Sequence, residues 1–131
     1  MSGVLQMYSN GMTIVRADFH LHTRKDKEFK YTGEDNSFVT KYIDALKEQE
    51  IQVGVITNHN KFDVDEFKAL RKKAGKNDIF LLPGVELSVK EGSNGVHTLI
   101  VFDPDKWLEN GTNHIEAFLT EAFAGIVNRE K

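Results

Sequence analysis

The residues of this sequence that could do chemistry begin with His20 and His22, which stand one residue apart after an apolar run. In an extended strand, residues i and i+2 point to the same side, so the two imidazoles can meet at one point in space. Paired imidazoles are typical ligands of first-row metal ions. Because so short a motif also occurs by chance, an ordinary pair of histidines beside a turn is the alternative. Asp18 can accept the proton of a ligating ring and fix its tautomer, or it is an ordinary charge at a strand end.

Three further patches along the chain carry metal-ligand chemistry. His59 follows Asn58 at the tip of an apolar run, and the alternative is a surface histidine in a polar turn. Glu86 interrupts an apolar stretch, where a buried carboxylate is costly unless it is paired or bound to metal. Its two oxygens can bridge two cations, although alternation along a strand also allows it to face water. His97 begins a last apolar run, either as a ligand or at the mouth of a hairpin.

Charged residues near these patches are candidates for supporting roles. Arg24, Lys25 and Lys61 can hold a phosphate group near bound metal ions, and solvated surface is the alternative for each. Asp26 and Glu28 are candidate oxygen ligands. The loop that contains them is rich in charges, so we expect both side chains to lie in solvent.

Composition limits the possible functions of the chain. Its 131 residues are enough for one domain with a core, and the net charge of −3 provides no general basic field for nucleic acid or an anionic membrane. Without cysteine there is neither a disulfide framework nor a thiolate metal site, so any metal would have nitrogen and oxygen ligands. This composition suits a cytoplasmic protein. We find no apolar run long enough for a transmembrane helix and no signal peptide.

The elements that must position these residues alternate between strands and helices, which predicts an α/β fold with a mainly parallel sheet and flanking helices. Ligands in such folds gather at the carboxyl ends of strands, where the histidine patches fall. We expect Trp107 in the core and His114 in a structural role. The predicted strands are residues 4–8, 13–19, 51–57 and 79–82, followed by a hairpin of 85–89 and 96–102. The first predicted helix is 38–49, capped by 35–37. The second begins at Asp63 or Asp65 and ends just before Gly75. The third is 113–128, capped by 112–113.

The ordered patches resemble the motifs of the polymerase and histidinol phosphatase (PHP) family of metal-dependent phosphoesterases. Asp18 to Thr23 matches a DxHxHT-like run, and Thr57 to His59 matches a TDH-like run. Pro83 to Glu86 matches a PGxE-like run, and His97 matches the histidine that follows. The resemblance covers about residues 13–102 and implies a partial (βα)7-type barrel. The rim of the complete family barrel holds two or three divalent metal ions, for which zinc, manganese and iron are all suitable.

The resemblance also implies roles for individual residues. His20 and His22 would bind one metal ion, Glu86 would bridge, and His59 and His97 would hold the others. Glu86 and His59 would then be catalytic in hydrolysing a phosphate ester with a metal-activated water. The remaining implied roles are support of the ligands by Asp18 and Asn58, and binding of the substrate phosphate by Arg24 and Lys61.

Two departures from the family pattern shape the functional hypothesis. Asn58 stands where the family usually has aspartate, and the later motifs of the family are absent after His97. A full barrel needs roughly 200 or more residues. We therefore interpret residues 1–131 as a single domain that corresponds to the N-terminal portion of a PHP protein. The expected substrate is a small-molecule or nucleotide phosphate ester.

Alternatives follow from the incomplete barrel. The chain could be a noncatalytic metal-binding or regulatory module of a larger protein, docked on a C-terminal ATPase domain, or an α/β domain without metal. An incomplete barrel also leaves an open sheet edge and apolar surface. We predict self-association, with a second copy covering that surface. The alternative is a compact monomer whose last helix folds over the gap.

Overall fold

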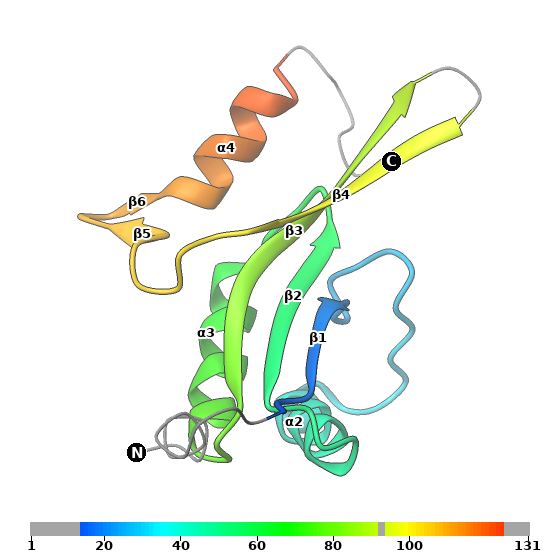
Figure 1. Cartoon of the computed structure of the whole chain (residues 1–131), viewed down its shortest axis with the longest axis vertical. Coiled ribbons are helices and arrows are strands. Elements are labelled where there is room, and N and C mark those ends of the chain that lie inside the picture. The colour runs from blue at the N-terminus through cyan, green and yellow to red at the C-terminus, as the bar shows by residue number, and fades with distance from the viewer. Residues whose placement is uncertain (1–13, 92–93, 125–131) are drawn as a thin grey trace.

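The computed structural model describes residues 14–91 and 94–124 (Figure 1), and these form a mixed α/β structure around one four-stranded sheet. Its strand order is β1-β2-β3-β4, in which β1 pairs with β2 and β2 with β3 in parallel, and β3 pairs with β4 in antiparallel. The predicted mainly parallel sheet is confirmed, and it curls into a half-barrel. The strands are β1 (Ala17–Leu21), β2 (Val53–His59), β3 (Phe80–Glu91) and β4 (Asn94–Val101).

Among the described residues, three α-helices accompany the sheet, and local capping explains where two of them begin. Asp63 accepts a hydrogen bond from the backbone N–H of Glu66 at the start of α3, and Asn113 caps α4 in the same way. The predicted side-chain cap of α2 is wrong, because residues 35–37 form a short 3₁₀ turn, η1 (Asp35–Ser37), without a capping bond. The helices are α2 (Phe38–Glu48), α3 (Val64–Gly75) and α4 (His114–Ala122), and a small ribbon of β5 (Leu108–Glu109) and β6 (Thr112–Asn113) precedes α4.

Strand β3 is longer than the sequence predicts, since the two strands expected on either side of Pro83 are one continuous strand. Pro83 lacks an N–H, but its carbonyl accepts a hydrogen bond from the backbone N–H of Phe102 at 2.9 Å, so the strand stays paired there. A Cβ atom at Gly84 would stand 2.6 Å from the carbonyl oxygen of Ile100. Glycine is therefore the residue that lets β4 approach β3 at this point.

Some predicted boundaries fall outside the described residues. These are the strand at 4–8, the first residue of the strand at 13–19 and residues 125–128 of the helix at 113–128. Within the described residues, β1 begins only at Ala17 and α4 ends at Ala122, so the predicted start of the strand and end of the helix are wrong. Within the described part of the chain, no helix is long and apolar enough to cross a membrane.

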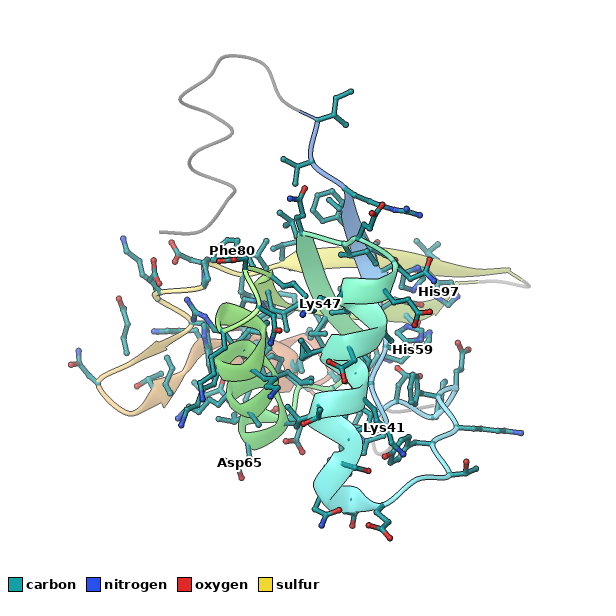
Figure 2. The ribbon with its side chains drawn as sticks, turned by 90° about the horizontal axis from the view of Figure 1, so that it is seen from below. Lys41, Lys47, His59, Asp65, Phe80 and His97 are labelled. Carbon is teal, nitrogen blue, oxygen red and sulfur yellow. The ribbon has the colours of Figure 1, made fainter. Side chains whose placement is uncertain are left out.

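The two faces of the sheet differ in how they are covered. Figure 2, seen from below, shows α2 and α3 on the same side of the strands. The core lies on that side, includes Trp107 as predicted, and also takes in Ile115 and Leu119 of α4.

Register partners share a face of a sheet, so Phe80, Leu99 and Val101 lie on the face that carries Glu86. These three side chains are exposed, so the face of Glu86 keeps an uncovered apolar surface. Ile115 and Leu119 of α4 are buried in the core, and the three exposed side chains are left uncovered by that helix.

Candidate metal centre

The ends of β1 and β2 and the interiors of β3 and β4 bring four histidines around the buried carboxylate of Glu86. Its Oε1 contacts Nε2 of His20 and lies 3.1 Å from Nε2 of His22. Its Oε2 lies 2.6 Å from Nε2 of His59 and 2.6 Å from Nδ1 of His97. Figure 2 shows His59 and His97 at the same end of the molecule. The structure thus brings together all five residues that the sequence predicts as metal ligands.

A bulge in β1 turns its histidines toward the cluster. Asp18 is the register partner of Gly54, but Leu21 is the partner of Ile56, so β1 contains one extra residue between these pairs. Without that residue, His20 would be the partner of Ile56 and would point to the helix-covered face. The bulge therefore places His20 and His22 on the face that carries His59 and Glu86.

Asp18 supports this bulge through the backbone. Its Oδ1 accepts a hydrogen bond from the backbone N–H of His20 at 2.9 Å. The predicted contact between Asp18 and the ring of a ligating histidine is therefore not the one observed. Asp18 contacts the backbone of the histidine instead. The carboxylate stabilises the local backbone shape that lets the two imidazoles converge.

Asp26 performs the ring-orienting role, and its predicted exposure is wrong. Only 3% of Asp26 is exposed, and its Oδ2 accepts a hydrogen bond from the backbone N–H of His59 at 2.6 Å. The same oxygen lies 2.9 Å from Nδ1 of the His59 ring. This contact leaves Nε2 of His59 to face Glu86. The tight turn from Thr23 to Asp26 buries the carboxylate, and the only sequence signal for it is the spacing of four residues from His22.

Glu28 lies beside this pair with its side chain mostly in solvent, as predicted. Its carboxylate oxygens are 3.9 Å from Nε2 of His59 and 4.0 Å from Nδ1 of His22, which is too far for hydrogen bonds. Its backbone N–H donates to Oδ1 of Asp26 at 2.8 Å. The side chain of Glu28 therefore borders the cluster without a hydrogen bond to it, while the backbone of Glu28 supports Asp26.

The two buried carboxylates of the cluster keep their negative charge. Burial alone would raise the pKa of Glu86, but the bonds to His97, His22 and His20 outweigh it and lower the pKa to about 2. Burial likewise opposes ionisation of Asp26, while backbone N–H groups of Glu28 and His59 hold its pKa below the usual value. Stable anions beside imidazoles are the donors that a divalent cation requires.

The donor atoms fall into three overlapping groups that could each hold a cation. Within each group, one ligand atom per residue lies within 4.8 Å of all the others. Nitrogen and oxygen donors in this mixture suit zinc, iron or manganese. The residues present thus fit divalent metal ions. The groups are His20, His22 and Glu86; His59, Glu86 and His97; and His22, Asp26, Glu28 and His59.

Asn58 contacts the loop after β1 and not a histidine ring. Its Oδ1 accepts a hydrogen bond from the backbone N–H of Thr23 at 2.8 Å, and its Nδ2 donates to Oγ1 of Thr23 at 2.9 Å. The hydroxyl of Thr23 in turn donates to Oε1 of Glu66 on α3. Asparagine supplies both the acceptor and the donor here, whereas aspartate would lack the donor.

The cations predicted to hold a phosphate have other contacts. Arg24 lies 2.9 Å from Oδ1 of Asp35 and stacks over the Phe38 ring, 4.5 Å from its centroid. Lys25 lies 3.8 Å from Oδ2 of Asp63. Lys61 follows the last residues of β2 and is half-buried, so its predicted role in phosphate binding stays a prediction.

A cavity of about 390 Å³ adjoins the cluster beside His20 and His22. Its lining is mostly apolar, and the hydroxyl of Tyr42 donates to the backbone carbonyl of His22 at 2.8 Å. His114 is not among the residues that line this cavity; it lies 3.8 Å from the carboxylate of Glu109, and its structural role stays a prediction. The remaining lining residues are Leu21, Phe29, Tyr31, Phe38, Lys41, Ala45 and Leu46.

Comparisons with known proteins identify the fold of the chain. No protein-family model and no curated protein sequence matches it. The structure resembles that of a candidate metal-dependent phosphoesterase from Bifidobacterium adolescentis, with a TM-score of 0.56 and 16% identity, over 86% of this chain and 34% of that chain. It also resembles an amidohydrolase from Chromobacterium violaceum, solved with bound sulfate and without metal, with a TM-score of 0.55 and 22% identity, over 82% of this chain and 33% of that chain.

These likenesses concern the fold alone, because both identities are low. The chain spans about a third of the length of each of the two structures. The half-barrel seen in this chain thus corresponds to a portion of each larger protein. The comparisons therefore show that this chain shares its fold with a portion of each of these two proteins.

Proposed function

We propose that this chain is the metal-binding portion of a phosphoesterase of the PHP type, which hydrolyses a phosphate ester with a metal-activated water. The observation that carries the proposal is the convergence of four histidines on the buried carboxylate of Glu86. The fold shared with a candidate metal-dependent phosphoesterase supports it. Bound divalent ions would supply hydroxide near neutral pH and neutralise charge on the phosphoryl oxygens.

The residues of the chain divide this work according to their geometry. Glu86 presents one oxygen to His20 and His22 and the other to His59 and His97, so it can bridge two cation positions. Asp26 holds the His59 ring with Nε2 toward Glu86. The apolar cavity beside His20 and His22 would exclude water from part of a bound ester.

A serine hydrolase mechanism is a poor fit to the same residues. Oγ of Ser88 lies 3.0 Å from Nδ1 of His97, and the carboxylate of Glu86 lies 2.6 Å from the same nitrogen. A nucleophile relay needs the hydroxyl and the carboxylate on opposite nitrogens of the ring. These contacts therefore favour ligation over nucleophilic catalysis by Ser88.

The uncovered apolar surface supports the proposal that the chain works within a larger assembly. Phe80, Leu99 and Val101 are exposed on the face that carries the cluster, and β1 and β4 form the two edges of the sheet. A second copy, or docking on a C-terminal ATPase domain of the same protein, would cover this surface. The substrate class, a small-molecule or nucleotide phosphate ester, and the cytoplasmic location stay predictions.

A noncatalytic metal-binding module is the second candidate function, and the contacts of Asn58 favour it. Both side-chain polar atoms of Asn58 bond to Thr23, which is a structural role. A module that binds metal to hold a loop in place needs no general acid or base at this position. Metal binding without turnover would distinguish this function from the first.

The test is metal content and phosphate release for the wild type, His20→Ala and, as a control, His114→Ala. We expect stoichiometric zinc, iron or manganese by elemental analysis, lost in His20→Ala and retained in the control. Weak release of phosphate from p-nitrophenyl phosphate that depends on the metal would support the phosphoesterase. Metal without any turnover would favour the noncatalytic module, and no metal after reconstitution would contradict both functions.

A further inference from the structure

Thr23, Asn58 and Glu66 form a buried hydrogen-bond chain that joins three elements of the fold. Thr23 follows His22 in the loop after β1, and Asn58 precedes His59 at the end of β2. Glu66 belongs to the first turn of α3 and is 7% exposed. The chain therefore links the helical layer to the residues next to two candidate metal ligands.

We propose that Glu66 is a positioning residue for the metal centre, acting through Thr23 and Asn58. It holds the loop after β1 against the end of β2, and so sets how His22 and His59 face each other. This inference rests on the proposed function in assuming that the two histidines take part in binding a divalent cation.

The direction of the hydrogen bonds shows why an acceptor is required on α3. The backbone N–H of Thr23 can only donate, so Asn58 must present Oδ1 to it and direct Nδ2 at the hydroxyl of Thr23. That hydroxyl already accepts a bond from Nδ2, and its own proton needs a different acceptor. Oε1 of Glu66 provides that acceptor.

Glu66 is itself held in place by the structure of α3. Its backbone N–H donates to the capping side chain of Asp63 at 2.8 Å. The next residue, Phe67, and Leu70 one turn later are buried in the core. Glu66 is thus a fixed point against which the loop after β1 is aligned, and Nε of Arg24 lies 3.5 Å from its other oxygen.

The buried hydrogen-bond chain aligns two candidate ligands of the metal centre. The ring centroids of His22 and His59 lie 4.7 Å apart. The buried hydrogen-bond chain fixes the backbone next to each of these rings. Metal ions tolerate only small errors in ligand position, so loss of a residue that orients ligands typically weakens binding about 10- to 100-fold. Loss of the Glu66 acceptor should therefore weaken metal binding without removing any ligand.

The experiment compares Glu66→Ala with Glu66→Gln and Leu70→Ala in the whole chain. Glutamine keeps an oxygen that accepts the Thr23 proton, whereas alanine removes it. Leu70→Ala makes a cavity on the same helix without touching the bonds, so it controls for loss of stability. The dissociation constant of Co²⁺ is measured from its visible absorption, and the free energy of unfolding from urea titrations.

We expect Glu66→Ala to weaken Co²⁺ binding about tenfold or more, and Glu66→Gln to restore it to within about threefold of the wild type. We expect Leu70→Ala to lower the free energy of unfolding with unchanged affinity. Wild-type affinity in Glu66→Ala would overturn the inference, as would an equal loss of affinity in Leu70→Ala.

A second measurement separates this inference from the proposed function. In the metal-free protein, the ring resonances of His22 and His59 should shift in Glu66→Ala and return in Glu66→Gln, while that of His114 stays unchanged. If the wild type binds no metal, the proposed function fails. Unchanged His22 and His59 resonances in Glu66→Ala would overturn the positioning role, whether or not metal binds.

Discussion

Two buried glutamates of this protein have opposite electrostatic behaviour, although they are almost equally hidden from solvent. Glu86 is 2% exposed and Glu66 is 7% exposed. Burial alone would raise both pKa values, yet the bonds from three histidines lower the pKa of Glu86 to about 2. The pKa of Glu66 stays raised by burial, since the Thr23 hydroxyl and the nearby cations offset the burial only in part.

The difference shows that low solvent exposure does not by itself decide the charge of a carboxylate, because the neighbours outweigh burial at Glu86 but not at Glu66. Glu86 is surrounded by imidazoles that favour its anionic form, which is the state that binds cations. Glu66 receives a hydroxyl bond, which a neutral amide could also accept. The first carboxylate is therefore suited to metal binding and the second to holding the structure together.

The largest expected effect comes from replacing glutamate by glutamine, which is the same chemical change at both positions. Glu86→Gln should lower the affinity for divalent metal by at least about 100-fold, because two of the three candidate cation positions lose their anionic ligand. Any metal-dependent phosphate release should fall with it. Elemental analysis and Co²⁺ titration measure the first effect, and a phosphate-release assay the second.

Glu66→Gln is the matched comparison for this prediction. It replaces a carboxylate by an amide at an equally buried position, but it keeps the acceptor for Thr23. We expect its metal affinity to stay close to that of the wild type. Equal losses in the two variants would contradict the difference drawn between the two sites.

The pH dependence of stability should also differ in sign between the two residues. The folded-state pKa of Glu86 lies below its ordinary value of 4.5, so its contribution is fully present above pH 4.5 and is lost as the pH falls toward 2. The folded-state pKa of Glu66 lies above 4.5, so its contribution is present below pH 4.5 and is lost as the pH rises through the raised value.

Urea unfolding of the metal-free protein between pH 2 and 7 measures this effect. The difference in unfolding free energy between wild type and Glu86→Gln should grow with pH from about 2 to 4.5. The difference between wild type and Glu66→Gln should change in the opposite direction at higher pH. Parallel pH curves for the two variants would show that the two carboxylates titrate alike.

The smallest expected effect concerns Asn58→Asp, which introduces the residue that the resembling PHP motif usually has at this position. A carboxylate cannot donate to Thr23 and would compete with Glu66 for the hydroxyl proton. We expect the free energy of unfolding to fall by about 1 kcal/mol at pH 7, measured from the urea midpoint. An unchanged or higher midpoint would show that the donor from Asn58 does not contribute to stability.

The sequence alone indicated which residues converge at the main site, whereas the bulge in β1 that turns His20 and His22 toward it came only from the structure. The strands predicted from apolar runs, residues 13–19 and 51–57, end shortly before the histidine patches, and parallel strands bring their carboxyl ends to one edge. The spacing of His20 and His22 and the interruption of an apolar run by Glu86 then predicted five residues that the structure brings together. These signals are local, because they depend on strand periodicity and on the direction of the chain.

Only the tertiary structure showed which carboxylates support the cluster and which cations are already engaged. Asp26 lies in a loop full of charges, and its spacing from His22 is too weak a signal to indicate that a turn buries it against His59. The placement of Asp18, Arg24 and Glu66 likewise depends on partners that are distant in sequence or on a bulge in β1. Alternation and strand order follow from local sequence, whereas the partner of a polar side chain is decided by the free energy of the whole packed arrangement.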